Sequence, residues 1–336
     1  MTHTAPPQDR GLVAIDIGGT TIKGIAITAD STVVRQSVIA TGGGGTAALD
    51  ALTGLVDTLA DSLTEAGVAL GGIGLVSPGI VDRASGVIGR AVNLGWEDVP
   101  LAGMLRNHFR VPVAVEHDAR AGALAEQHLN PRTRDADFAF IPIGTGIAAA
   151  LVANGVVVRG ASGAASEFGH VVAVRGGERC TCGQLGCVEA YASAAAIVRR
   201  YRRTGHEASS AEEIVRRLDD DDVAARIWDE AVSTLAIGLA SLVTMFDPAV
   251  IVLGGGLALA GNVLQDPLAE YLGHELGWRA APPIFLSEFG AHSALLGAVL
   301  VAEGDGSVWP TLAPVRIVDQ LDRTRPSVEI PLETAR

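Results

Sequence analysis

Residues 167–189 have the sequence EFGHVVAVRGGERCTCGQLGCVE, and this stretch contains all three cysteines of the chain. Cys180, Cys182 and Cys187 lie within eight residues, and His170 precedes the first of them by ten. Thiolate sulfur and imidazole nitrogen are preferred ligands of tetrahedral zinc, and four of them leave no open position. The spacing therefore predicts a structural zinc held by His170, Cys180, Cys182 and Cys187. The alternatives are three ordinary buried cysteines or a hydrolytic zinc, which the full ligand set opposes.

Composition indicates a globular α/β chain rather than a nucleic-acid or membrane protein. The 336 residues suit two domains, 48% are hydrophobic, and glycine occurs 41 times. A net charge of −13 opposes nucleic acid and anionic lipid as partners, because both require a basic surface. The first ten residues, MTHTAPPQDR, lack an apolar signal-peptide core, and clustered thiols favour the reducing cytoplasm.

Two glycine turns occur in similar surroundings. Residues 12–17 form an apolar run that leads into DIGGTTIKG at 16–24, after which residues 25–27 are apolar again. This pattern predicts strand, turn and strand. The glycines would let backbone N–H groups approach phosphates, with Thr20 and Thr21 as further donors and Asp16 holding hydrated Mg²⁺. The alternative is an ordinary tight hairpin.

A second turn repeats this device in the other half of the chain. Residues 138–143 are an apolar run followed by Gly144-Thr145-Gly146, a second run at 147–153 and an Asn154-Gly155 turn. Residues 144–149 match the dinucleotide fingerprint GxGxxA, but a hairpin signal stands where that motif requires a helix. The two turns therefore look like paired versions of one phosphate-facing element.

Strands and helices are predicted between and after the two turns. Residues 46–66 have leucine and valine at helical spacing, and residues 73–76, 111–115 and 250–253 are predicted to be buried strands. The strand at 111–115 leads to His117 and Asp118, where Asp118 would cap the next helix. Residues 193–203, 223–246 and 291–302 are predicted helices, and the four aspartates at 219–222 a solvated turn.

The Gly-His pair followed by Cys-x-Cys-Gly-x-x-Gly-Cys-x-Glu resembles the signature of the ROK family of repressors, open reading frames and sugar kinases. The resemblance covers about residues 11–303. It implies a two-domain actin-like ATPase fold of sugar kinases with a duplicated βββαβα-type core. The implied domains are residues 1–120 joined by a helix at about 291–303, and residues 121–290 with the zinc loop at 167–189, followed by a tail at 304–336.

The resemblance also implies roles for individual residues. Asp118 would be the catalytic base. Sugar contacts would come from Gly79, Asn93, His117, Asp118, Glu167, His170 and Glu189. Contacts to ATP and Mg²⁺ would come from Asp16, Gly18, Gly19, Thr20, Thr21, Lys23, Gly144, Thr145, Gly146, Gly254, Gly255 and Gly256.

These roles describe an ATP-dependent kinase of glucokinase type that phosphorylates the 6-hydroxyl of glucose or a close relative and forms a homodimer, as is usual in the family. Three positions depart from the family pattern: Ala148 and Ser166 replace glycines, and His117 replaces an asparagine. His117 therefore keeps an amino-hexose kinase (glucosamine or 3-amino-3-deoxyglucose type) or an N-acyl-hexosamine kinase open. A sugar-sensing regulator is the alternative of another class. It is opposed by the acidic charge and by the short segment of about ten residues before the first predicted strand.

Overall fold

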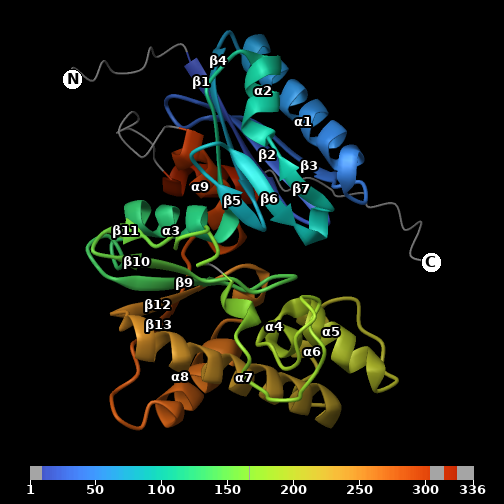
Figure 1. The fold of residues 1–336 in the computed structure, drawn as a ribbon, viewed down its shortest axis with the longest axis vertical. Helices are drawn as coiled ribbons and strands as arrows, with labels where there is room; N and C mark the ends of the chain where they lie inside the picture. Colours follow the sequence, from blue (N-terminus) through green and yellow to red (C-terminus); the bar gives the residue numbers. More distant parts are fainter. Residues whose placement is uncertain (1–9, 166, 303–313, 324–336) are drawn as a thin grey trace. The chain divides into compact units, whose positions relative to one another are not determined.

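The computed structural model describes residues 10–165, 167–302 and 314–323, and Figure 1 shows the helices and strands. The chain divides into two compact units. Unit 1 comprises Met1–Ala125 and Ala294–Arg336, and unit 2 comprises Glu126–Ser293. Each unit has its own hydrophobic core.

Unit 1 is built on a five-stranded sheet with the strand order β3-β2-β1-β4-β8. Its strands are β1 (Arg10–Ile17), β2 (Thr21–Thr28), β3 (Val33–Ala40), β4 (Ala69–Ser77) and β8 (Val113–His117). The first three are antiparallel, whereas β4 and β8 run parallel to β1. The carboxyl ends of β1, β4 and β8 therefore meet at one edge of the sheet. In open sheets with parallel strands, ligands bind at this edge.

Helices α1 (Gly45–Glu65) and α9 (Ser293–Ala302) cover opposite faces of this sheet (Figure 1). Helix α1 buries Leu52, Val56, Leu59 and Leu63, as the helical spacing predicted. Helix α9 lies so close to β4 that a Cβ at Gly74 would sit 2.0 Å from the carbonyl oxygen of Ala298. Only glycine allows this approach, so the last long helix is fixed to the sheet of unit 1.

A small antiparallel sheet follows β4 in unit 1. It consists of β5 (Ile80–Asp82), β6 (Val87–Ala91) and β7 (Trp96–Val99), with the 3₁₀ helix η1 (Val92–Leu94) between the last two and helix α2 (Leu101–Phe109) after them. The indole N–H of Trp96 donates to the carbonyl oxygen of Gly45 over 2.9 Å. This bond fixes the loop before β7 against the start of α1.

Unit 2 repeats the topology of unit 1. Its strands are β9 (Phe138–Pro142), β10 (Ala150–Ala153), β11 (Val156–Val157), β12 (Val250–Gly254) and β13 (Ile284–Leu286), in the order β11-β10-β9-β12-β13. The antiparallel and parallel pairs occupy the same places as in unit 1. The predicted α/β fold with a duplicated core is confirmed. Asn154 and Gly155 both have positive φ, at 52° and 74°, as a tight hairpin turn requires.

The helices of unit 2 form its core together with this sheet. They are α4 (Glu189–Ala192), α5 (Ala194–Arg203), α6 (Ala211–Val215), α7 (Asp222–Phe246) and α8 (Asn262–Glu275), with 3₁₀ helices η2 (Phe168–His170), η3 (Gly256–Ala260) and η4 (Gly290–His292). Helix α7 is long and apolar enough to cross a membrane by length and composition alone. Its apolar residues, such as Trp228, Leu235 and Leu239, belong to the core of unit 2.

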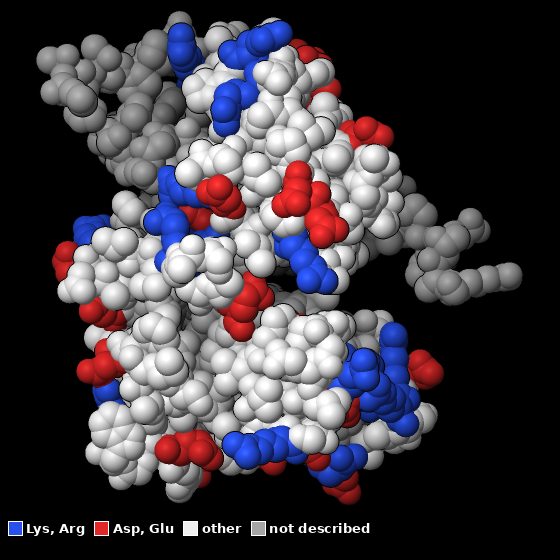
Figure 2. All heavy atoms as spheres, in the orientation of Figure 1, with Lys and Arg blue, Asp and Glu red and all other residues white. Residues whose placement is uncertain are grey.

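Basic side chains gather over α5 and α6 on the face drawn in Figure 2, with acidic side chains at their edge. The arginines there are paired with glutamates: Arg203 lies 2.6 Å from Glu178, and Arg216 and Arg217 pair with Glu212 and Glu213. This patch is therefore largely neutralised by its own neighbours.

Three details differ from the sequence-based expectations or add to them. Asp221 is not a solvated turn residue but the N-cap of α7, where it accepts backbone N–H bonds from Val223 and Ala224. Helix α3 (Asp118–Leu129) begins at Asp118, which places that residue in the first turn rather than at the cap. A helix, α10 (Pro314–Arg323), occurs within the predicted tail, and its Gln320 side chain accepts a bond from Val33 N–H over 3.0 Å. Ser166 and most of the tail lie outside the described residues.

Candidate active site and metal centre

The turn between β1 and β2 is closed by short backbone bonds. Gly18 N–H donates to the carbonyl oxygen of Thr21 over 2.9 Å, and a Cβ at Gly18 would lie 2.8 Å from that oxygen. The Thr41 hydroxyl donates to the Gly18 carbonyl over 2.7 Å, and Thr41 N–H donates to the Thr20 carbonyl over 3.0 Å. The turn is therefore held in one shape, with Thr20 exposed at its tip. Such glycine turns expose N–H groups that suit phosphate oxygens.

Asp16 stands next to this turn at the end of β1, in register with Lys23 of β2. Burial raises the pKa of the Asp16 carboxyl to about 6, and the negative charge of Asp118 adds to the effect while Lys23 opposes it. A carboxyl group with this pKa is ready to ionise when a cation arrives, because the cation supplies the missing stabilisation of the charge. Asp16 can therefore hold a magnesium ion through its hydration shell.

His117 and Asp118 lie where β8 ends and α3 begins. His117 is buried, whereas 36% of the Asp118 side chain is exposed. Asp118 Oδ1 accepts a bond from the N–H of Ala119 over 2.6 Å, and His117 Nδ1 lies 3.1 Å from the same oxygen. The Ala119 N–H also donates to His117 Nδ1 over 3.2 Å, so this one backbone N–H holds both the carboxylate and the imidazole in place.

Two predicted sugar contacts come from the small sheet of unit 1. Gly79 has a φ of 92°, and a Cβ there would lie 2.2 Å from the carbonyl oxygen of Arg90, so this position requires glycine. Asn93 lies in η1 and packs on the phosphate turn, since a Cβ at Gly19 would be 3.2 Å from the Asn93 Cβ. Unit 1 therefore brings Asn93 and the turn at Gly18–Thr21 together.

In unit 2 the turn at Gly144–Gly146 lies beside the turn at Gly254–Gly256. Ile143 N–H donates to the Gly254 carbonyl over 2.9 Å, and Leu257 N–H donates to the Ile143 carbonyl over 3.0 Å. Gly255 has a φ of 77°, and a Cβ there would lie 2.5 Å from the Ile143 carbonyl oxygen. The turn at Gly144–Gly146, with Thr145 exposed, thus meets the turn at Gly254–Gly256. The structure brings these predicted nucleotide contacts together.

Glu189 connects the zinc loop with the first of these turns. It is the first residue of α4 and follows Cys187 by two positions. Its Oε2 accepts a bond from Ile147 N–H over 2.9 Å, and a Cβ at Gly146 would lie 2.6 Å from that oxygen. Glu189 is therefore held at a fixed place beside the turn, where its carboxylate can accept bonds from hydroxyl groups.

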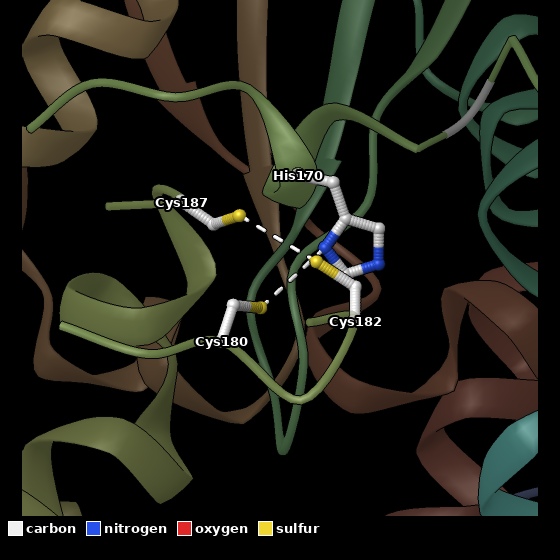
Figure 3. Close-up of side chains that lie close together, drawn as sticks. All are labelled: His170, Cys180, Cys182 and Cys187. Atoms are coloured by element: carbon white, nitrogen blue, oxygen red, sulfur yellow. Dashed lines mark hydrogen bonds between the residues drawn. The ribbon is translucent and has the colours of Figure 1, made fainter. Parts of the chain in front are cut away.

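The four predicted metal ligands converge. Figure 3 shows the His170 ring and the sulfurs of Cys180, Cys182 and Cys187 pointing toward one another, and their ligand atoms all lie within 4.8 Å. Cys180 Sγ is 3.7 Å from His170 Nδ1, and Cys182 Sγ is 3.7 Å from Cys187 Sγ. A tetrahedral zinc with Zn–S bonds of about 2.3 Å separates its sulfurs by about 3.8 Å. The residues present therefore fit zinc.

Burial and the close approach of the thiols change their protonation. Burial, followed by the neighbouring sulfurs of Cys182 and Cys180, raises the pKa of the Cys187 thiol to about 12. A bound divalent ion reverses this preference, because metal-bound thiols are deprotonated. His170 Nε2, on the other side of the ring from the cluster, lies 3.6 Å from Glu167 Oε2. The predicted metal ligand His170 and the predicted sugar ligand Glu167 are thus neighbours.

Several residues that support the site were not predicted from the sequence. Thr41 fastens the first phosphate turn, and its only sequence signal is its place before four successive glycines. Tyr191 supports the zinc loop, since its hydroxyl accepts a bond from Glu178 N–H over 2.8 Å. Arg200 stacks on the Tyr191 ring at 4.7 Å. These contacts join α4 and α5 to the zinc loop, and no local sequence pattern predicts them.

Comparisons with known proteins give a consistent set of relatives. The ROK family model matches residues 12–305. A glucokinase from Halalkalibacterium halodurans is 33% identical over 283 residues, which is 79% of this chain and 86% of that protein. A putative xylose repressor from a Caldicellulosiruptor species is 33% identical over 211 residues, but these are 59% of this chain and 53% of the repressor.

Solved structures give the same result. The structure of a ROK hexokinase from Thermus thermophilus is 35% identical, with a TM-score of 0.72, and the match covers 87% of this chain and 97% of that one. The structure of a ROK family glucokinase from Streptomyces griseus in complex with glucose and AMPPNP is 27% identical, with a TM-score of 0.76, covering 87% and 99%.

Proposed function

The chain belongs to the ROK family, and we propose that this ATP-dependent sugar kinase phosphorylates the 6-hydroxyl of glucose or a closely related hexose. The observation that carries the proposal is the Asp118 carboxylate, partly exposed at the start of α3 and oriented by Ala119 N–H. A general base must be reachable and held in place. Asp118 meets both requirements.

In the proposed reaction Asp118 accepts the proton of the sugar 6-hydroxyl. The sugar oxygen forms a bond to the γ-phosphorus of ATP while the bond from that phosphorus to the β,γ-bridging oxygen breaks, and ADP leaves. Positioning and charge neutralisation supply most of the catalysis in such transfers. Asp16 and Lys23, with the donors Gly18, Gly19, Thr20 and Thr21, are proposed to neutralise phosphate and hold Mg²⁺. In unit 2, Gly144, Thr145, Gly146, Gly254, Gly255 and Gly256 are proposed to contact the nucleotide.

Sugar contacts are proposed in each unit separately. In unit 2 they are Glu167, His170 and Glu189, and in unit 1 they are Gly79, Asn93 and His117. Carboxylates suit adjacent hydroxyl groups because each offers two acceptor oxygens. The zinc would be held by His170, Cys180, Cys182 and Cys187, and it would supply rigidity to the loop that carries Glu167 and Glu189.

The experiment that tests the proposal is a coupled assay of ADP formation with Mg-ATP and a panel of hexoses, in wild type and in Asp118→Asn. The amide keeps the shape of the carboxylate but cannot take a proton, so kcat should fall by about 10²- to 10⁴-fold. Sugar binding measured by calorimetry should persist. If Asp118→Asn turns over at a nearly normal rate, Asp118 is not the base.

A second candidate is a kinase for an amino-hexose or an N-acyl hexosamine. It is favoured by the buried His117, whose Nδ1 lies 3.1 Å from Asp118 Oδ1, beside the place where the sugar would be deprotonated. The same sugar panel separates the two candidates. We do not propose a DNA-binding regulator, because the net charge of −13 opposes it. We propose a homodimer because the family resemblance implies one. We propose the reducing cytoplasm as the compartment because the three cysteines of the zinc loop are free thiols.

A further inference from the structure

A buried cluster of charged side chains lies directly behind the proposed base. The Glu116 ion cluster consists of Arg83, Glu116 and Arg120, all in unit 1. Glu116 is fully buried at the end of β8, and Arg120 is 1% exposed in the first turns of α3. Charged residues are almost never buried to this extent unless they are paired. The cluster flanks His117 and Asp118 in the sequence on both sides.

The contacts of Glu116 lead to the backbone of the base. Its Oε1 accepts a bond from the backbone N–H of His117 over 2.9 Å and one from Arg120 Nε over 2.7 Å. One oxygen atom therefore accepts bonds from the N–H of the Glu116–His117 peptide and from the Arg120 side chain, which follows Asp118 by two residues. Through these two bonds Glu116 connects the start of the His117–Asp118 segment to the helix that follows it.

The same cluster reaches the small sheet that carries the proposed sugar contacts. Arg83 follows β5 directly, and its Nη1 lies 3.4 Å from Glu116 Oε2. Arg120 Nη2 lies 3.5 Å from the carbonyl oxygen of Val81 in β5. Strand β5 starts one residue after Gly79, and β6, its partner, leads into η1 with Asn93. The Glu116 ion cluster thus joins the strand of the base to the sheet of the sugar loops.

Arginine suits this connection better than lysine. Its planar guanidinium presents several N–H donors in fixed directions, whereas a lysine ammonium is a point charge on a flexible stem. A buried ion pair adds little net stability, because desolvation offsets the attraction. The desolvation penalty of burying Glu116 and Arg120 is therefore explained by the geometry that the pair fixes rather than by a gain in stability.

We propose that Arg120, through Glu116, is a positioning residue that sets the place of Asp118 relative to the sugar loops at Gly79 and Asn93. This role rests on the proposed function of Asp118 as the base. A misplacement of about 1 Å far from the chemistry can lower the rate about 10²-fold, so the expected effect is on kcat. The KM for ATP should stay within about twofold, because the bonds of Glu116 and Arg120 to the His117 N–H and the Val81 carbonyl concern the base and the sugar loops.

The first experiment compares Arg120→Met and Arg120→Lys with the control Arg216→Met. Arg216 also pairs with a glutamate four residues earlier, Glu212, but both side chains are largely exposed, at 68% and 73%. We expect kcat to fall about 10²-fold in Arg120→Met and at least tenfold in Arg120→Lys. Lysine keeps the positive charge but lacks the fixed N–H donors of the guanidinium. Arg216→Met should match wild type in kcat and in both KM values.

The second experiment is a double-mutant cycle with Asp118→Asn. If Arg120 acts by placing Asp118, Arg120→Lys should cost much less in the Asp118→Asn background than in wild type, because the group that it positions is no longer functional. A general loss of structure would lower the rate equally in both backgrounds. The fraction of folded protein is measured for each variant by circular dichroism at the assay temperature.

A double variant provides the test if the single Arg120→Met variant does not fold. Glu116→Gln/Arg120→Met removes both buried charges, and replacing a whole pair is far less destabilising than breaking it. This double variant should be folded and should show the same loss of kcat. Folded Arg120 variants with wild-type kcat, or equal losses in both backgrounds, overturn the positioning role. A normal rate for Asp118→Asn alone instead overturns the assignment of the base.

Discussion

Glu189 Oε2 accepts a hydrogen bond from the backbone N–H of Ile147 over 2.9 Å. Through this bond the end of the zinc loop is fixed to the segment that follows the Gly144–Gly146 turn. Gly169 lies at the same place, since a Cβ there would be 2.3 Å from the Ile147 carbonyl oxygen. Proposed sugar and nucleotide contacts of unit 2 are therefore parts of one hydrogen-bonded structure rather than separate loops.

The first prediction concerns Gly146→Ala. The new methyl group would lie 2.6 Å from Glu189 Oε2, which is closer than real contacts allow, so the carboxylate must move. We expect the sugar KM to rise about tenfold or more, because a displaced carboxylate loses its bonds to the sugar hydroxyls. Steady-state kinetics with varied sugar at saturating ATP measure this change.

A matched control is Gly54→Ala in α1, where the added Cβ meets no atom within 4 Å. This variant should keep wild-type kinetics and gain up to about 1 kcal/mol in unfolding free energy, because alanine is the better helix former. An unchanged sugar KM in Gly146→Ala would show that Glu189 does not bind the sugar from its present position.

The second prediction concerns the metal. Cys182 is exposed, so Cys182→Ser removes a ligand with little steric effect. We expect the variant to lose its zinc, to melt at a lower temperature and to show a raised sugar KM, because the loop no longer holds Glu167 and Glu189. Elemental analysis should find about one zinc per wild-type chain. Thr181→Ser, at an exposed neighbouring position, should retain the metal. Active wild-type protein free of zinc would refute the structural role.

The third prediction concerns pH and Asp16, whose pKa burial raises to about 6 from an ordinary value of 3.8. The folded protein holds this proton more tightly than the unfolded chain does, so stability falls as pH rises between these two values. Above about pH 6 the ionised group costs the fold up to about 3 kcal/mol. Asp16→Asn removes the charge and should therefore be more stable than wild type at pH 7.5.

The measurement is chemical unfolding from pH 5 to pH 8 without added magnesium or nucleotide. The advantage of Asp16→Asn should grow from pH 5 to about pH 7 and then level off, because the wild-type carboxyl is by then ionised. Asp61→Asn, at an exposed position on α1, serves as the control and should show no such trend. A stability difference that is constant with pH would contradict the raised pKa of Asp16.

Local patterns predicted most of the fold. Apolar runs on either side of the glycine turns and the Asn154–Gly155 turn identified the hairpins, and leucine spacing identified α1, because each signal depends on neighbours within a few residues. The two glycine turns indicated a duplication, and both sheets have the same strand order. The cysteine spacing indicated a cluster, and the four side chains converge.

The unpredicted features depend on contacts between distant segments. Thr41 bonds to Gly18 across 23 residues, and Arg83 pairs with Glu116 across 33. Asp221 was assigned to a solvated turn because four aspartates in succession are usually exposed, yet its position before α7 makes it a cap. The burial of Arg120 also has no local signal, since an arginine on a helix is ordinarily exposed. Such features become visible only when the segments are placed in space.

The last prediction concerns His117, which stands where the family resemblance expects asparagine. Asparagine offers an amide donor and a carbonyl acceptor, whereas neutral histidine offers one N–H and one ring nitrogen in a larger frame. In this chain His117 Nδ1 faces the N–H of Ala119 at 3.2 Å and Asp118 Oδ1 at 3.1 Å, so the ring is fixed beside the base. We therefore expect the pattern of sugar hydroxyls or amines recognised there to differ from that of an asparagine-containing site. A site built around specific polar partners discriminates strongly when one of them is left unpaired.

The change to test is His117→Asn, and the measurement is kcat/KM for glucose, mannose, glucosamine, 3-amino-3-deoxyglucose and N-acetylated hexosamines. Wild type should accept an amino-hexose, or an epimer altered near the 3- or 4-position, at least as well as glucose. His117→Asn should shift the ratio of kcat/KM values toward glucose by tenfold or more, which corresponds to about 1.4 kcal/mol. His108→Asn, at an exposed histidine on α2, is the matched control and should leave the ranking unchanged. If wild type and His117→Asn rank the sugars identically with glucose far ahead, then His117 only replaces the asparagine donor and does not set the specificity.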